Sequence, residues 1–263
     1  MPSDPRAIES LLGFWAEAGV DAIVLDAPVD RLAERPRAAP QRISPAAVKP
    51  QAGAAPDLSG AIAEARERAA QAQDIESLAA AIAAFDGCGL KREGARQAVF
   101  SRGAADAPVI LIGEAPGADE DMQGAPFVGR AGKLLDRMLA AAGLEGRVFI
   151  TNTVFWRPPG NRNPTPAEQL LCAPFLERAI ALVQPRLLVL AGGAAAKALL
   201  QRPEGILALR GRWFDWTSSD ETIALPALPT LHPAFLLRQP AAKKRAWADL
   251  MLLAERLDRA ERP

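Results

Sequence analysis

The chain is predicted to fold as an α/β protein with a parallel sheet, because strands and helices alternate from residue 109 onward. Four short segments are almost wholly apolar, a pattern typical of parallel strands that are covered on both faces. They are residues 109–113, 148–152, 187–191 and 224–231. Helical segments follow them, and alternation of this kind places helices on both sides of one sheet.

The helices are indicated by their end signals. In residues 130–142 an apolar stripe from Leu134 to Leu139 is followed by Gly143, a residue common just after a helix. Thr165–Glu168 is a capping box with proline at the first helical position, so a helix starts there. We therefore expect helices over residues 130–142, 165–183, 194–200 and 240–257.

The chain before residue 59 has a different composition. Residues 1–27 are predicted to form a helical extension, and residues 28–58 a Pro/Ala-rich linker in which six prolines exclude a continuous helix. We expect one globular domain over residues 59–263. It opens with an alanine-rich helix that reaches Phe85 and is broken near Asp74.

Composition and charge exclude several classes of protein. With 49% hydrophobic residues the chain supplies a full core, and no apolar run approaches the length of a membrane span. The 31 basic and 31 acidic residues cancel, which argues against binding to polyanions through global charge. Two cysteines form no disulfide framework and the N-terminus lacks a signal-peptide pattern, so we expect a cytoplasmic protein.

His232 is the only histidine in the chain, and it follows the last predicted strand. A lone histidine is most often a packing or capping residue. Here Pro233 favours an extended conformation at the strand end, and ligands bind at the carboxyl ends of strands in open α/β sheets. Because the imidazolium form of histidine stabilises a developing anion, His232 is a candidate catalytic residue.

Polar or glycine-rich motifs follow other strands as well. After the first comes Gly113–Asp121, whose glycines admit a ligand close to the backbone and whose carboxylates can act as acids or bases. The structural alternative for Gly113–Asp121 is a solvated acidic turn. In Gly124–Gly132, Phe127 offers a ring for stacking, and the structural alternative is a phenylalanine that packs back on the core. After the second strand, Asn152 can read the edge of a pyrimidine, and the rigid Arg157–Pro164 loop suits phosphate contacts.

Five motifs in this order resemble those of family 4 uracil-DNA glycosylases. They are Gly113–Gly117 (Gly-Glu-Ala-Pro-Gly), Gly124–Gly132 (Gly-x-Pro-Phe-Val-Gly-Arg-Ala-Gly), Thr151–Asn152, Arg157–Pro164 (Arg-Pro-Pro-x-Asn-Arg-x-Pro) and His232–Arg238 (His-Pro-Ala-x-Leu-Leu-Arg). The resemblance implies a three-layer α/β/α sandwich with a central four-stranded parallel sheet. It also implies hydrolysis of the N-glycosidic bond of uracil in DNA, a DNA-repair reaction that leaves an abasic site.

The chemistry of base excision gives three of these residues a role in recognition. A glycosylase reads the flipped base by hydrogen bonds to its edge and by stacking on a ring. Phe127 would supply the ring, and Asn152 would read the edge of uracil and reject cytosine. Gly113 would let the base approach the backbone.

Catalysis and DNA binding are assigned to other residues. His232 would stabilise the uracil anion, and Glu114 or the Glu120–Asp121 pair would orient water or stabilise the sugar. Leu236 or Leu237 would fill the gap that the flipped base leaves in the duplex. Contacts to the DNA backbone are expected from Arg157, Asn161, Arg162 and Arg238.

The cysteine pattern departs from the family. The resemblance implies four cysteines that bind a [4Fe-4S] cluster, but here Phe85 and Trp156 occupy two of those positions. Only Cys88 and Cys172 are left, and two thiolates do not complete the coordination of such a cluster. We therefore expect no cofactor, with the two rings filling the vacated volume and the two thiols inert.

Several alternatives stay open at this stage. The chain is compatible with a catalytically weak or inactive DNA-binding relative of the same fold, with a glycosylase for another deaminated base such as hypoxanthine, and with a nucleotide hydrolase unrelated to repair. We expect a monomer that acts on uracil-containing DNA, single- or double-stranded, and that is nucleoid-associated in a bacterium. No membrane contact is expected.

Overall fold

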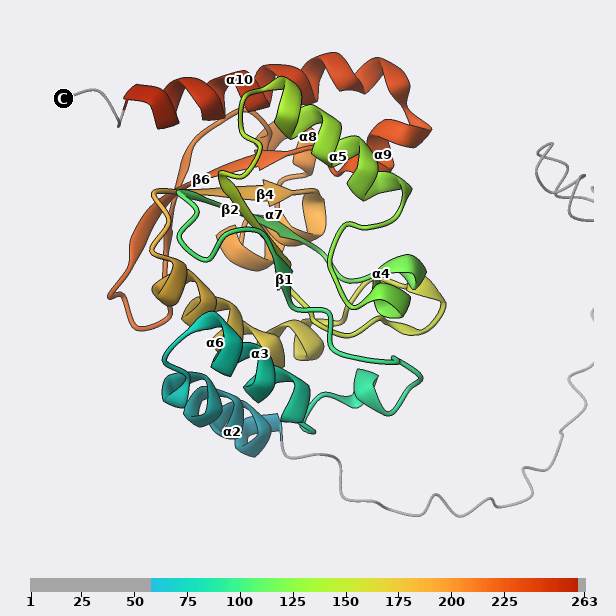
Figure 1. Cartoon of the computed structure of the whole chain (residues 1–263), viewed down its shortest axis with the longest axis vertical. Helices are drawn as coiled ribbons and strands as arrows, with labels where there is room; N and C mark the ends of the chain where they lie inside the picture. Colours follow the sequence, from blue (N-terminus) through green and yellow to red (C-terminus); the bar gives the residue numbers. More distant parts are fainter. Residues whose placement is uncertain (1–57, 260–263) are drawn as a thin grey trace, which may run out of the picture. The chain divides into compact units, whose positions relative to one another are not determined.

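The computed structural model describes residues 58–259. The extension predicted for residues 1–27 and nearly all of the linker predicted for residues 28–58 lie outside the described residues. Within them the chain forms one six-stranded sheet flanked by helices (Figure 1). The strands are β1 (Ser101–Arg102), β2 (Val109–Gly113), β3 (Val148–Asn152), β4 (Leu187–Ala191), β5 (Phe214–Thr217) and β6 (Ala224–Thr230). The α-helices are α2 (Leu58–Gln71), α3 (Ile75–Ala84), α4 (Ala118–Gln123), α5 (Arg130–Ala141), α6 (Pro166–Val183), α7 (Gly193–Leu200), α8 (Ile206–Leu209), α9 (Pro233–Arg238) and α10 (Lys243–Arg259).

The centre of the sheet confirms the predicted parallel arrangement. The strand order is β1-β3-β2-β4-β6-β5, and the four inner strands run parallel. The register pairs Gly113 with Asn152 and Ala191 with Thr230, which are the last residues of their strands. The carboxyl ends of neighbouring strands therefore lie level at one edge of the sheet.

The sheet has two edge strands in addition to the four predicted parallel strands. β1 pairs antiparallel with β3, and β5 pairs antiparallel with β6. β1 is only two residues long, and three of the four residues of β5 are at least partly exposed. Neither segment therefore has the continuous apolar run that marks an inner strand.

Alternate residues along the inner strands face two separate cores, which gives the predicted three layers. On one face, Ile110 and Ile112 of β2 pack with residues of α2, α3, α6 and α7. On the other, Val109 and Leu111 of the same strand pack with residues of α5 and α10. Figure 1 shows α5 and α10 on one side of the sheet and α2, α3 and α6 on the opposite side.

The helix ends follow the capping signals in the sequence. The predicted break near Asp74 is confirmed, because Asp74 caps α3 and its carboxylate accepts from the Ser77 N–H at 2.7 Å. Thr165 caps α6 by accepting from the Glu168 N–H at 3.3 Å. The final helix begins at Lys243, after a 3₁₀ turn over Pro240–Ala242 that the prediction merged with it. No helix in the described part of the chain is long and apolar enough to cross a membrane.

Candidate active site

The strand ends bring the predicted base-binding residues together. A Cβ atom on Gly113 would lie 2.4 Å from Asn152 Oδ1 and 2.6 Å from Phe127 Cζ, so any side chain there would displace the amide or the ring. The centroid of the Phe127 ring lies 5.4 Å from that of the His232 ring, with the ring planes tilted by 33°. A glycine, an amide, an aromatic ring and an imidazole thus meet at one edge of the sheet.

Asn152 presents an unpaired amide to this group. It ends β3 and is only 2% exposed, and its side chain forms no hydrogen bond with the described residues. A ligand that offers a donor and an acceptor side by side would satisfy both ends of this amide.

Phe127 is held in place through its backbone. Its φ of 55° lies in the left-handed region, which residues other than glycine seldom adopt. Arg102 of β1 donates from Nε to the Pro126 carbonyl at 2.8 Å and from Nη2 to the Phe127 carbonyl at 3.2 Å. The Phe127 carbonyl also lies close to Gly132 in the first turn of α5. A Cβ atom at Gly132 would lie 1.5 Å from the carbonyl oxygen, so only glycine fits there. The sequence does not predict this role of Arg102, because a lone arginine in a two-residue edge strand gives no signal.

His232 caps α9 and is neutral. Its Nδ1 accepts from the Ala234 N–H at 3.1 Å, so the proton of the neutral ring is on Nε2. Burial, followed by the positive charge of Arg238, lowers the pKa of His232 to about 4, while the carboxylate of Glu120 acts in the opposite direction. The ring is therefore an uncharged imidazole at neutral pH, and not an imidazolium. The group available is a neutral hydrogen-bond donor.

The structure favours Glu114 over Glu120 as the carboxylate that is free to react. Glu114 Oε1 is buried and has no hydrogen-bond partner in the described part of the chain, and burial raises the pKa of this side chain. Glu120 accepts from the N–H groups of Gly117, Val128 and Gly129 at 3.0–3.1 Å, which ties the loop after β2 to the Phe127 loop. Asp121 is also engaged, since it accepts from the Arg96 N–H at 2.8 Å.

Two further residues fix the backbone of the site, and neither stands out in the sequence. Thr153 Oγ1 donates to the Glu114 carbonyl at 2.6 Å. Asp249 of α10 is fully buried, accepts from Thr230 Oγ1 at 2.7 Å and forms an ion pair with Arg210. Thr230 ends β6 two residues before His232, so this buried group anchors the strand that carries the histidine.

The residues predicted to contact DNA divide into two groups. Arg157 donates from Nε to Asn161 Oδ1 at 2.7 Å and is partly exposed, so both stay on one loop surface. Arg238 is exposed at the end of α9. Arg157 Nη1 also lies 4.0 Å from the Asp121 carboxylate, and Arg162 makes two hydrogen bonds to the Glu168 carboxylate, at 2.6 and 2.9 Å. Arg162 is therefore the more strongly engaged within the protein, although it is exposed.

The two leucines predicted to fill the gap in the duplex differ in their burial. Leu236 is fully buried and packs with Leu134 of α5 and Ala246 of α10, which makes it a core residue. Leu237 is only partly buried at the last turn of α9. Of the pair, Leu237 is the side chain that could reach into DNA.

An aromatic cluster occupies the region where the resemblance implies a metal cluster. Phe85 and Trp156 are 0% and 1% exposed, with ring centroids 6.4 Å apart, and Phe85 packs edge-on against Phe175 at 5.3 Å. Cys88 and Cys172 are fully buried and share a hydrogen bond, and burial raises the pKa of the Cys172 thiol. The described residues include no group of three or more His, Cys, Asp or Glu side chains placed to hold a metal ion. Two thiols and two packed rings do not fit a cluster that needs four thiolates.

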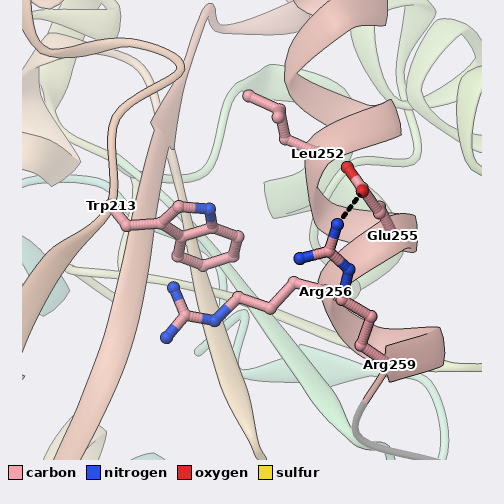
Figure 2. Close-up of a pocket in the computed structure, with 5 residues that line it drawn as sticks. All are labelled: Trp213, Leu252, Glu255, Arg256 and Arg259. Atoms are coloured by element: carbon pink, nitrogen blue, oxygen red, sulfur yellow. Dashed lines mark hydrogen bonds and ion pairs between the residues drawn. The ribbon is translucent and has the colours of Figure 1, made fainter.

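A hollow of about 420 Å³ lies away from these residues, between the C-terminal half of α10 and the segment before β5 (Figure 2). The guanidinium of Arg256 stacks on the Trp213 ring at 4.3 Å, and Arg259 pairs with Glu255. Its two arginines are therefore engaged by a ring and a carboxylate. None of the predicted site residues lines this hollow.

Comparison with known proteins points to one family. Residues 100–251 match the sequence model of the uracil DNA glycosylase superfamily. The chain is 38% identical over 192 residues to the type-4 uracil-DNA glycosylase of Pyrobaculum aerophilum, covering 71% of this chain and 96% of that protein. It is 38% identical over 164 residues to the type-4 enzyme of Sulfurisphaera tokodaii, covering 60% of this chain and 74% of that protein. It is also 38% identical over 149 residues to the type-4 enzyme of Thermotoga maritima, covering 56% of this chain and 75% of that protein.

Proposed function

This chain belongs to the type-4 branch of the uracil-DNA glycosylase superfamily, and on that premise we propose that it excises uracil from DNA by hydrolysing the N-glycosidic bond. The single observation that carries the proposal is the convergence of Phe127, Asn152 and His232 around Gly113. An unpaired amide, a ring face and a neutral donor are the groups that a flipped pyrimidine requires.

Recognition of uracil would depend on the Asn152 amide. Its N–H donates to a uracil carbonyl and its oxygen accepts from the ring N3–H, whereas cytosine presents the opposite pattern at these positions. The Phe127 ring covers one face of the base. Gly113 leaves the space that a side chain would fill.

The chemical step would then use His232 and Glu114. The bond between C1′ of the sugar and N1 of uracil breaks, and its electron pair leaves on the base. The His232 Nε2–H donates to the uracil oxygen on which the negative charge develops, a contribution typically of about 10²–10³ in rate. Water adds its oxygen to C1′, and its proton passes to the free carboxylate of Glu114.

We propose that the protein acts on DNA as a monomer in the cytoplasm, where its two buried thiols stay reduced, and without a [4Fe-4S] cluster. The packing of Phe85 and Trp156 supports the last point. Contacts to the DNA backbone are assigned to the partly exposed Arg157 and to the exposed Asn161 and Arg238.

The test is release of free base from oligonucleotides that differ at one position. Wild-type protein should release uracil and leave an alkali-labile abasic site, while matched strands with thymine or cytosine stay intact. Release of hypoxanthine at a higher rate than uracil would identify a glycosylase for another deaminated base. Binding to all strands without base release would identify an inactive relative.

A further inference from the structure

A second recess lies beside α9, outside the residues assigned to base excision. It has a volume of about 260 Å³ and is lined by Met138 of α5 and by Lys243, Lys244 and Trp247 of α10. We call it the α10 recess. Trp247 is 39% exposed, although tryptophan is usually well buried in a monomeric protein.

The spacing of these residues places two charges and a ring on one surface. Lys243 and Lys244 precede Trp247 by about one turn of α10, so the three side chains share a face of the helix. Met138 adds an apolar wall from the neighbouring helix. Lysines beside an exposed aromatic ring are the combination with which proteins hold the phosphate and the base of single-stranded nucleic acid.

The lysine charges beside the recess have no ion-pair partner among the described residues. Lys243, Lys244 and the adjacent Arg245 are exposed and form no ion pair with the described residues. No acidic residue lies in the first turn of α10, although negative charge is what stabilises that end of a helix. A bound phosphate would supply the missing negative charge.

α9 connects the proposed active site to the recess. His232 caps α9, and the chain then passes through a 3₁₀ turn directly into α10. Leu134, Leu236 and Ala246 form one small core that holds α5, α9 and α10 together, and Ala246 adjoins Trp247. A strand whose uracil enters the site would therefore continue across α9 toward the recess.

We propose that the α10 recess binds an unpaired nucleotide of the DNA strand next to the flipped uracil, with its phosphate on Lys243 and Lys244 and its base stacked on Trp247. This rests on the proposed function for the direction of the strand. A base that stacks on the indole must be free of its own duplex stack, so the recess favours single-stranded DNA over duplex DNA.

The experiment measures binding of a fluorescently labelled, uracil-free single strand and of the same sequence as a duplex, over a series of salt concentrations. Lys243→Ala/Lys244→Ala should weaken single-strand binding and lower the salt slope by about 1.4, the effect of two lost phosphate contacts. Trp247→Ala should weaken single-strand binding on the order of tenfold with little change in slope, and Trp247→Phe should restore most of it. Duplex binding should change much less with Trp247→Ala.

The matched control is Arg256→Ala/Arg259→Ala, which removes two cations from the same helix about 20 Å further along its axis. It should bind like wild type. Wild-type affinity of the recess variants, or an equal loss in the control, would overturn the proposal. An equal effect of Trp247→Ala on duplex and single strand would also overturn it.

Since the ligand contains no uracil, the result is independent of base excision. A protein that loses single-strand binding through these variants but releases no uracil would contradict the proposed function and support the recess. If the wild type releases uracil but the recess variants bind the single strand normally, the proposed function is supported and the recess is contradicted.

Discussion

The imidazole of His232 is neutral at pH 7, because burial and the charge of Arg238 hold its pKa near 4 instead of 6.5. In the unfolded chain the ring binds a proton at about pH 6.5. The unfolded state therefore gains from protonation before the folded state does. The protonation of His232 therefore does not reduce the free energy of unfolding above pH 6.5, and it reduces it increasingly as the pH falls toward 4.

A variant that cannot take up the proton should lose this part of the pH dependence. We expect the melting temperature of the wild type to fall more between pH 7 and pH 5 than that of His232→Gln, which keeps a side-chain donor but does not titrate. Thermal melts at constant ionic strength measure both curves. Parallel curves would show that the ring is not shielded from protons in the folded state.

Asn152 should control both the rate of excision and the choice of base. Asn152→Ala removes two hydrogen bonds in a buried site, where each unpaired partner costs about 1–3 kcal/mol, so the single-turnover rate should fall by about 10²-fold or more. Asn152→Asp should also be impaired, because a carboxylate cannot donate to the uracil carbonyl. Wild-type rates in either variant would remove Asn152 from the site.

Residues of the site are predictable from the sequence when their chemistry is local to a motif. Asn152, Phe127 and His232 each stand at a strand end or in a glycine-rich loop, and the structure brings them together. The pairing of Arg162 with Glu168 depends on the turn between them, and the sequence alone assigned the guanidinium to DNA. The protonation state of His232 depends on burial, which its motif does not encode.

At the level of elements, the short strand β1 positions the loop that carries Phe127. Arg102→Ala removes both hydrogen bonds to that loop, so we expect weaker binding of uracil-containing DNA and slower excision, with most of the stability retained. Asp136→Ala is the control, because it removes only the exposed ion pair that Arg102 makes on its outer side. Steady-state kinetics of the two variants would separate these roles. Equal activity of Arg102→Ala and Asp136→Ala would show that the loop holds its shape without the arginine.

The elements that the sequence predicts are those whose residues face a single environment. The inner strands are buried on both sides and read as apolar runs, and α3 and α6 start at clear capping residues. The edge strands β1 and β5 are short and half covered, so their pairing depends on neighbours far away in the chain. The positioning role of Arg102 is hidden for the same reason.

At the level of the molecule, every residue proposed for recognition and chemistry lies within residues 58–259. A truncated chain that begins at Leu58, where α2 starts, should therefore keep the excision rate of the full chain. Single-turnover assays of both proteins on one oligonucleotide would measure this. A truncated protein that melts normally but is inactive would assign residues 1–57 a part in the site.

Phe85 and Trp156 stand at two positions where the resemblance implies cluster-binding cysteines, and this feature sets the chain apart from the family pattern. Phe85, Trp156 and Phe175 fill one buried region together with the two cysteines. None of these residues belongs to the group around Gly113. We therefore propose that the rings stabilise the fold, while the residues at the strand ends excise the base without a metal cluster.

The measurement that tests this claim most directly combines iron content with uracil release on one anaerobic preparation of the wild-type protein. We expect the preparation to be colourless, to contain well under one iron per chain and to release uracil from DNA. Cys88→Ser and Cys172→Ser should release uracil as well. About four irons per chain, or release that is lost when the iron is removed, would contradict the claim.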